Sequence, residues 1–373
     1  MMTTRLNMTI SAMANKKTVC ITAALAAVFF LCAFPAVAGA ANAPAVNAPR
    51  ANAAASMLMD AGTTRVLASL NAHARLPMAS TTKVMTALVA LENCALDALV
   101  TVDERAYAME GSSMYLRLGE KLTLEDLLYG LMLSSGNDAA VAIAVHVGGS
   151  AEGFGQLMNT RAATIGCANT NFVTPNGLHD ANHYTSAYDL ALITCEAIGN
   201  EAFRTIVGTQ YWVCKSGEVA RTLKNKNKLL WNFNGGNGVK TGYTQDAGKC
   251  LVFSAERDGN TVVGVLLNCP DMWKDAAAYL NYGFDHFTWE LIAAADETMA
   301  QVKVQYGLKN SLALTVNEDI LVPLREDETL EAVTVKLKCP RTLEAPVYAG
   351  QSVGTMEAYA DGRLLKSVPL VAA

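Results

Sequence analysis

The hydrophobic pattern of this chain changes near residue 296, and that change limits the folds open to it. Before it, apolar residues recur at helical spacing in several segments, whereas from Val302 onward they alternate with polar residues. A period of two places every second side chain on one face of a strand. The alternation is clearest at 332–338, and Asp361-Gly362 predicts a hairpin turn. We therefore predict a small all-β domain without a helix, a β-sandwich, over 296–373.

The residues before this change mix helix and strand signals. Apolar stripes at helical spacing predict helices over 123–133, 137–147 and 186–199. Two apolar runs around a short Gly-containing connection predict an antiparallel hairpin of 250–256 with 261–268. We also expect strands at 56–60 and 65–70, a helix from Ser80 onward and a closing helix at 278–292. The predicted fold class is α/β (α+β), with an antiparallel sheet flanked by helices over 55–292.

The first 38 residues have the layout of a secretory signal peptide. Arg5, Lys16 and Lys17 precede an apolar run over 19–34, and small residues at 36–40 fit a cleavage site. The run is shorter than the roughly 20 residues of a membrane span, which favours removal over a retained anchor. Between the signal and the fold, the Ala/Asn/Pro-rich residues 39–54 predict a flexible leader.

Charge excludes one class of partner. The 373 residues carry a formal net charge of -5, and no run of Lys and Arg exceeds two residues. Nucleic acids and anionic membranes are attracted by a clustered positive field, which this sequence does not supply. We therefore expect no nucleic-acid partner.

A hydroxyl and an amine stand three places apart in "MASTTKV", at 78–84. Pro77 precedes a helical apolar pattern, so Ser80 is expected in the first helical turn, on the same face as Lys83. Such a pair can act as nucleophile and base if burial and a nearby cation lower the pKa of the lysine. Taken alone, the pair also fits a helix-capping serine beside a solvated lysine.

Two further motifs add to this pair. "SSGN" at 134–137 places a hydroxyl and an amide between two predicted helices, and "VKTGYT" at 239–244 precedes a predicted hairpin strand. The order S-x-x-K, S-x-N, K-T-G is that of penicillin-binding proteins and class A β-lactamases. The gaps are 55 residues from Ser80 to Ser135 and 105 residues from Ser135 to Lys240.

With these motifs the chain resembles the serine-type D-alanyl-D-alanine carboxypeptidases, which are low-molecular-mass penicillin-binding proteins. Longer segments also look like the family, among them "GSSMYLRLGEKLTLEDLLYGLMLSSGNDAAVAIA" and "GVKTGYTQDAGKCLVFSAERDG". The resemblance is strong over 54–287 and extends by position to the β tail. It implies a β-lactamase/penicillin-binding-protein-like catalytic domain over 55–292.

The resemblance implies roles for individual residues. Ser80 would attack the carbonyl between two terminal D-alanines, Lys83 would take its proton, and Ser135 would relay a proton to the leaving amine. Asn137 would bind the substrate amide carbonyl. The substrate carboxylate would face Lys240 and Thr241, Gly242 would allow close backbone approach, and the backbone N–H groups of Ser80 and Tyr243 would form the oxyanion hole. The implied partners are a peptidoglycan stem peptide ending in D-Ala-D-Ala and β-lactams that acylate Ser80, with no cofactor and no metal.

The chain departs from some family members at the substrate carboxylate. A histidine of those members is replaced by Tyr243, which leaves the backbone donor in place. An arginine beyond the hairpin that holds the carboxylate in some members has no counterpart, because 269–276 offers Met272, Trp273 and Lys274. Lys274 would supply a point charge without the bidentate geometry of arginine.

Several alternatives stay open. His179, Asp180 and His183 could bind a metal if they lay on a helix, but Gly177 and Asn182 favour a loop. A class A β-lactamase would need a deacylating Glu in an E-x-x-L-N setting, which we do not find between the second and third motifs. A cell-wall D,D-endopeptidase or transpeptidase would use the same ester chemistry, and a catalytically silent β-lactam-binding or wall-binding protein would share the fold.

The C-terminal residues bear on location. Many relatives carry an amphipathic helix after the β domain that lies on the membrane surface. Here the chain ends in "GRLLKSVPLVAA", which alternates as a strand and contains Pro369. We expect a mature protein outside the cytoplasmic membrane, free or associated with the wall, in which a membrane anchor is not evident.

Overall fold

The computed structural model describes residues 48–360 and 362–373. The predicted signal peptide and most of the predicted leader lie outside these residues. The leader prediction is wrong for its last residues, because Ala51 is buried and the backbone N–H of Ala54 donates to Leu267 O at 3.0 Å. Ala51 and Ala54 are thus already part of the folded domain, although their sequence shows no periodic pattern. Within the described residues, no helix is both long enough and apolar enough to cross a membrane.

A five-stranded antiparallel sheet forms the centre of the N-terminal region, with the strand order β2-β1-β9-β8-β7. Its strands are β1 (Ala55–Asp60), β2 (Val66–Leu70), β7 (Gly236–Thr244), β8 (Gly248–Arg257) and β9 (Asn260–Leu267). The predicted hairpin is confirmed as β8 and β9. The strand that carries the third motif, β7, lies at one edge of the sheet, where only one side is paired.

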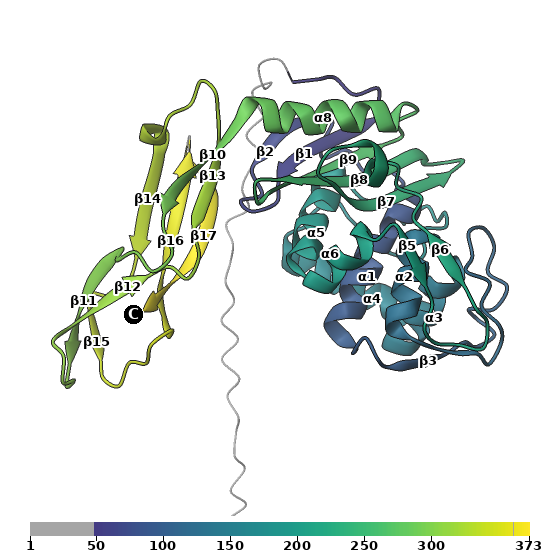
Figure 1. Ribbon diagram of the computed structural model, residues 1–373, viewed down its shortest axis with the longest axis horizontal. Helices are drawn as coiled ribbons and strands as arrows, with labels where there is room; N and C mark the ends of the chain where they lie inside the picture. The colour runs from purple at the N-terminus through teal and green to yellow at the C-terminus, as the bar shows by residue number, and fades with distance from the viewer. Residues whose placement is uncertain (1–47, 361) are drawn as a thin grey trace, which may run out of the picture. The chain divides into compact units, whose positions relative to one another are not determined.

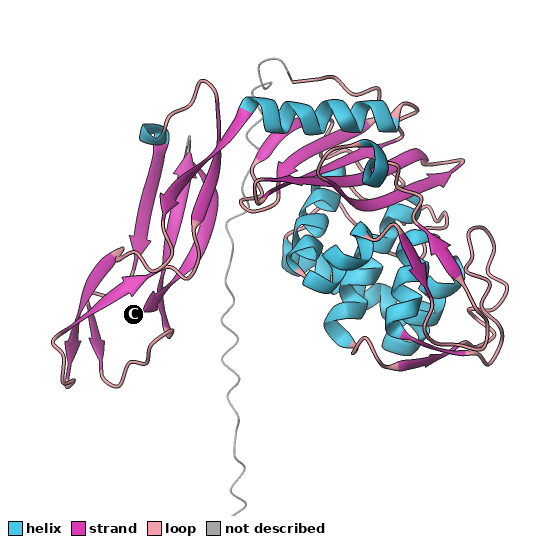
Figure 2. Ribbon diagram, in the orientation of Figure 1, coloured by secondary structure: helices cyan, strands magenta, loops and turns pink. Residues whose placement is uncertain are grey.

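Helices cover both faces of this sheet (Figures 1 and 2). Successive side chains of a strand point to opposite faces, and in β1 all six residues are buried. Met57 and Met59 join the core shared with helices α1 to α6, whereas Leu58 joins the core shared with α8. The bounds of these helices are α1 (Lys83–Asn93), α2 (Leu124–Leu133), α3 (Asn137–Gly148), α4 (Ala151–Ile165), α5 (Ala187–Gly199), α6 (Glu201–Gly208), α7 (Leu229–Asn232) and α8 (Met272–His286).

The three helices predicted from apolar stripes are confirmed as α2, α3 and α5. Three helices, α4, α6 and the short α7, were not anticipated. In α4 two glycines dilute the pattern, yet Phe154, Met158 and Ala162 recur every four residues and are all buried. Ser150 caps this helix by accepting a hydrogen bond from the backbone N–H of Gly153 at 3.0 Å.

The closing helix predicted over 278–292 is wrong in its second half. The helix α8 ends at His286, and Phe287–Ala293 forms the strand β10, which pairs with β13 (Ile320–Arg325). A short apolar run fits helix and strand equally well by periodicity, so the pairing partner decides. The chain therefore enters the sheets of its C-terminal region before residue 296.

The C-terminal region is an all-β unit of two sheets. The larger sheet has the order β14-β16-β17-β12-β11-β15, and β10 with β13 forms the smaller one. Side chains of both sheets share a core that includes Ala293, Ile320, Leu314 and Leu370. The remaining strands are β11 (Ala300–Gln305), β12 (Ser311–Thr315), β14 (Val333–Lys338), β15 (Thr342–Glu344), β16 (Ser352–Ala360) and β17 (Arg363–Ala372).

Two details of this region differ from or extend the prediction. A short 3-10 turn, η2 (Leu330–Ala332), corrects the expectation that the region has no helix. The predicted hairpin is confirmed by the antiparallel pairing of β16 with β17, in which Ala360 faces Arg363, although Asp361 itself lies outside the described residues. Two small hairpins complete the N-terminal region: β3 (Leu99–Thr101) with β4 (Lys121–Thr123), and β5 (Tyr211–Val213) with β6 (Thr222–Lys224).

Candidate active site

Ser80 lies in a tight turn that precedes the first α-helix. The turn is a 3-10 helix, η1 (Ala79–Thr82), and α1 begins at Lys83. Ala79 has a φ of +50°, an uncommon backbone conformation for a residue with a side chain. The hydroxyls of Thr81 and Thr82 hold the turn by donating to Met78 O at 2.6 Å and Ala79 O at 2.8 Å. Ser80 is therefore presented from a strained and well-anchored turn.

The amine of Lys83 is fully buried beside the Ser80 hydroxyl. Its Nζ atom lies 2.9 Å from Ser80 Oγ, 2.7 Å from Asn137 Oδ1 and 2.7 Å from Asn176 O. Burial, followed by the charges of Lys240 and Lys226, holds the pKa of Lys83 well below its usual range. A neutral amine has two hydrogens, which serve the two carbonyl oxygens, and one lone pair, which faces the Ser80 hydroxyl. This is the geometry that a general base requires.

The second motif forms the turn between α2 and α3. Ser135 is 5% exposed and has a left-handed φ of +63°, a strained conformation that sets the direction of its side chain. The amide of Asn137 spans two neighbours, because its Oδ1 accepts from Lys83 and its Nδ2 donates to Glu110 O at 2.7 Å. A carbonyl can only accept, so the orientation of this amide follows from its partners. With both groups engaged, Asn137 acts on Lys83, and its predicted contact with substrate stays a prediction.

The third motif brings β7 against η1. An added Cβ on Gly242 would lie 3.1 Å from the backbone N of Ser80 and 3.1 Å from Met78 O. Only glycine allows the strand to come this close. The two predicted oxyanion donors, the N–H groups of Ser80 and Tyr243, therefore belong to adjacent segments. Tyr243 is 67% exposed, so its side chain does not come between the backbones of β7 and η1.

Lys240 is a second buried lysine on β7. It is 1% exposed, and its Nζ donates to Thr241 O at 2.8 Å. Burial and the charge of Lys226 lower its pKa to about 7. An anionic group that reached this amine would replace the lost hydration and restore its charge. The structure thus supplies a buried amine whose ammonium form an incoming carboxylate would stabilise.

Two groups of the site were not predicted from the sequence. The backbone carbonyl of Asn176 accepts from Lys83, a contact that no side-chain pattern could reveal. An added Cβ on Gly177, whose φ is +84°, would lie 2.0 Å from Ala79 O, so the loop of these residues packs directly on η1. The second group is Lys226, whose charge acts on both buried lysines.

His183 holds this loop in place. Its Nδ1 accepts from the backbone N–H groups of Val173 at 3.0 Å and Thr174 at 3.3 Å. The hydrogen is therefore on Nε2, which lies 2.8 Å from the Thr82 hydroxyl. Burial lowers the pKa of this imidazole to about 4. Both ring nitrogens are thus engaged within the protein, and the described residues contain no group of three or more His, Cys, Asp or Glu side chains that could hold a metal.

Two other sequence candidates lie at the surface. His179 is half exposed, with Nδ1 3.5 Å from the carboxylate of Asp246. Lys274 is exposed in the first turn of α8, where the neighbouring Trp273 lies under the amine of Lys228 at 5.9 Å. The assignment of Lys274 to the substrate carboxylate stays a prediction.

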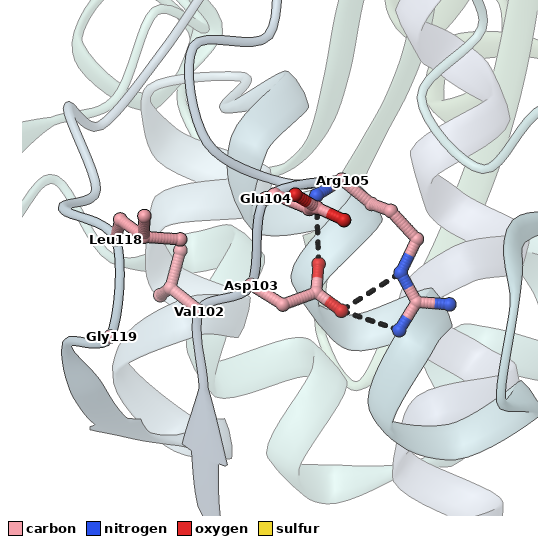
Figure 3. Close-up of a pocket in the computed structure, with 6 residues that line it drawn as sticks. All are labelled: Val102, Asp103, Glu104, Arg105, Leu118 and Gly119. Atoms are coloured by element: carbon pink, nitrogen blue, oxygen red, sulfur yellow. Dashed lines mark hydrogen bonds and ion pairs between the residues drawn. The ribbon is translucent and has the colours of Figure 1, made fainter.

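A surface hollow lies apart from the motif residues. It is lined by Val102, Asp103, Glu104, Arg105, Leu118 and Gly119 (Figure 3), none of which belongs to the three motifs. The Arg105 guanidinium donates through Nε to Asp103 at 2.8 Å, which closes the turn. The candidate active site is therefore the set of polar groups around Lys83, and this hollow is not part of it.

Two family models match this chain. One, described as D-alanyl-D-alanine carboxypeptidase, matches residues 42–271, and the other, described as penicillin-binding protein 5, C-terminal domain, matches residues 287–373. The second match begins at the first residue of β10. The agreement supports the assignment of that strand to the C-terminal sheets.

Individual proteins are also similar over most of their length. D-alanyl-D-alanine carboxypeptidase DacF of Bacillus subtilis is 33% identical over 331 residues, which cover 86% of this chain and 85% of that protein. The solved structure of penicillin binding protein 5 from Haemophilus influenzae has a TM-score of 0.70 and 30% identity, covering 87% of this chain and 97% of that one. The Streptomyces K15 DD-transpeptidase has a TM-score of 0.61 and 37% identity, covering 64% and 99%.

Proposed function

The chain belongs to the D-alanyl-D-alanine carboxypeptidase family of serine peptidases and penicillin-binding proteins, and from this premise we propose that Ser80 is its nucleophile. The substrate is then a peptidoglycan stem peptide that ends in D-Ala-D-Ala. The terminal D-alanine leaves, and the remaining peptide is held for a time as an ester of Ser80.

The observation that supports this proposal most directly is the contact of Ser80 Oγ with the buried amine of Lys83, at 2.9 Å. A serine hydroxyl is a weak nucleophile unless a base takes its proton. Lys83 can serve because burial and two neighbouring cations favour its neutral form. The helix-cap interpretation of the same pair is less favourable, because a capping serine needs no buried amine beside it.

Acylation proceeds in two proton transfers. Ser80 Oγ forms a bond to the carbonyl carbon of the penultimate residue while its proton moves to Lys83, and the N–H groups of Ser80 and Tyr243 stabilise the oxyanion. The carbon–nitrogen bond then breaks. The proton passes through Ser135 to the leaving nitrogen, so that neutral Lys83 is restored.

Deacylation repeats these steps with water. A water molecule gives its proton to the same base and attacks the ester carbonyl, and Ser80 leaves with a proton. The carboxylate of the terminal D-alanine faces Lys240 and Thr241 during acylation and departs with the leaving D-alanine before water attacks. No step uses a cofactor or a metal ion.

Release of D-alanine tests the nucleophile. We compare wild type with Ser80→Ala on a pentapeptide ending in D-Ala-D-Ala, and we label both with a fluorescent penicillin. Ser150→Ala is the matched control, because it removes a serine that caps α4 outside the site. Wild type and control should release D-alanine and take the label. Equal release by Ser80→Ala would remove Ser80 from the mechanism.

A second outcome for the same acyl-enzyme is transfer to an amine instead of water. The similar Streptomyces protein is known by the name DD-transpeptidase, so related sites accept this chemistry. Product analysis with an added amino acceptor distinguishes the two reactions. A cross-linked product would favour transpeptidation, and free tetrapeptide alone would favour the carboxypeptidase; cleavage of cross-linked dimers would show endopeptidase activity.

We place the enzyme outside the cytoplasmic membrane, where its polymer substrate lies. Support comes from the signal-like pattern of residues 1–38 and from the substrate class of the family. Fractionation of cells that produce the protein tests this location. Mature protein that begins near Gly39 in the extracytoplasmic fraction is expected, and uncleaved protein in the cytoplasm would contradict it.

A further inference from the structure

Three lysines project from one extended segment beside the site. Residues 222–229 alternate between exposed and buried, so that Lys224, Lys226 and Lys228 lie on the exposed side. The outer two rest on aromatic rings, with Lys224 5.5 Å from Tyr211 and Lys228 5.9 Å from Trp273. Lys226 has different partners, and these belong to the site.

The amine of Lys226 joins two segments around the second motif. Its Nζ donates to Ser134 O at 2.8 Å and to Ser112 Oγ at 3.2 Å. Ser134 directly precedes Ser135 and is the C-cap residue of α2, whose terminal carbonyls favour a cation. Ser112 O in turn accepts from the backbone N–H of Asn137 at 2.7 Å. One cation therefore fixes both flanks of the Ser135–Asn137 turn.

The backbone that carries Lys226 is itself held firmly. The side chain of Asn225 donates to Val207 O at 3.1 Å and to Thr209 O at 3.0 Å. It also accepts from the backbone N–H of Asn227 at 2.9 Å. Both asparagines are buried, so the lysine between them projects from a rigid base. A lysine on such a rigid backbone can hold the neighbouring Ser135–Asn137 turn in one position.

We propose that Lys226 is a positioning residue for acylation, which holds Ser135 and Asn137 against Lys83 and supplies a positive charge at the rim of the site. The inference rests on the proposed function, because it assigns a role in the reaction of Ser80. It concerns a residue outside the three motifs. Ser135 needs such support since its left-handed backbone is not the one a serine prefers.

The charge of Lys226 acts in a direction that can be measured. The charged groups that bear on Lys83 are Lys240 on β7, Lys226, and Asp138 on α3, and of these only Asp138 favours the ammonium form. The pKa of the His183 imidazole, which contacts Thr82, is lowered to about 4 by burial, so this ring is neutral over the neutral and mildly acidic part of the pH profile. Removal of the Lys226 charge therefore raises the pKa of Lys83. Acylation requires neutral Lys83, so its rate falls at low pH, and this fall is the acid limb of the pH profile. The acid limb then moves to higher pH.

The test is the pH profile of β-lactam acylation for wild type, Lys226→Met and Lys226→Arg. Lys226→Met should acylate on the order of ten- to hundredfold more slowly at neutral pH. Its acid limb should move up on the order of half a pH unit or more. Lys226→Arg keeps the charge and a donor for Ser134 O, so its acid limb should stay with wild type. Lys224→Met and Lys228→Met are the matched controls, because they remove equal charge from the same face.

Each result decides between explanations. An unmoved acid limb in Lys226→Met, or the same movement in Lys224→Met, would overturn the proposal; so would a Lys226→Arg profile that follows Lys226→Met. Melting temperatures of all variants show whether a slow variant is folded. The wild-type protein tests the proposed function separately. If a β-lactam does not acylate Ser80 in wild type, the proposed function is wrong. If wild type is labelled normally but the acid limb of Lys226→Met does not move, only the proposed role of Lys226 is wrong.

Discussion

The side-chain nitrogen of Lys83 lies 2.9 Å from the hydroxyl of Ser80, and it makes its other two hydrogen bonds to uncharged carbonyl oxygens. No carboxylate is among these partners. A lysine in such surroundings gains little from being charged, because burial removes its hydration and none of these hydrogen-bond partners is anionic. The low pKa of Lys83 is thus built into the partners that the fold provides.

Replacing this amine should stop acylation. In Lys83→Met the side chain keeps its approximate length but has no base, and in Lys83→Arg the guanidinium stays protonated. We expect both variants to label with penicillin about 10²- to 10⁴-fold more slowly than wild type. Stopped-flow or gel labelling measures this rate, with circular dichroism as a check on folding. Labelling of folded Lys83→Met at the wild-type rate would show that another group takes the Ser80 proton.

Binding of a carboxylate should weaken as the pH rises above about 7, because the pKa of free Lys240 is lowered to about 7. A bound carboxylate restores the ammonium form, so at higher pH binding requires uptake of a proton. Affinity then falls by up to about tenfold per pH unit. Calorimetry of a D-Ala-D-Ala peptide with the Ser80→Ala variant measures binding without turnover.

Two comparisons make this prediction specific to Lys240. The same peptide with an amidated C-terminus should show no such pH dependence. Lys240→Gln should weaken the carboxylate peptide about ten- to hundredfold and remove the dependence. Equal losses on both peptides would instead indicate that Lys240 supports the structure of β7.

Gly242→Ala should impair the reaction more than the fold. The new Cβ would lie 3.1 Å from the backbone N of both Ser80 and Thr81, so β7 must move away from η1. We expect acylation to slow on the order of tenfold or more, since the two oxyanion donors are displaced. Gly199→Ala in α5 is the control, because its added Cβ would meet no other segment of the chain within 4 Å. A Gly242→Ala enzyme with wild-type acylation would show that this approach is not required.

Acid should destabilise the protein through His183. Its pKa is lowered from 6.5 to about 4 in the fold, so the unfolded chain binds the proton more readily between these values. The contribution of this residue is complete above pH 6.5 and declines as the pH falls towards 4, by about 3 kcal/mol at most. Urea unfolding of wild type and His183→Gln across this range measures it.

The comparison of the two proteins isolates this one group, because their other titrating residues are the same. His183→Gln should be less stable than wild type at pH 7, and the difference should shrink as the pH approaches 4. A constant difference in the free energy of unfolding across the range would contradict the assignment of a neutral imidazole.

Local patterns in the sequence were sufficient for the helices α2, α3 and α5, for the β8–β9 hairpin and for the pairing of Ser80 with Lys83. Each depends on residues close together in the chain, where periodicity and turn residues act directly. The motif order was equally informative, because it names side chains whose chemistry is specific. The same patterns could not separate helix from strand at 287–293, where pairing with β13 decides.

Only the tertiary structure determined how the site controls its lysines. The Asn176 carbonyl and the Lys226 amine reach Lys83 and the Ser134 turn from segments far away in sequence, and neither contact leaves a pattern of residue types. The amide of Asn137 was assigned to substrate from the motif, whereas the fold uses both of its ends. The sequence by itself thus determined which groups could react. Burial and distance set their protonation, and these exist only after distant segments have packed together.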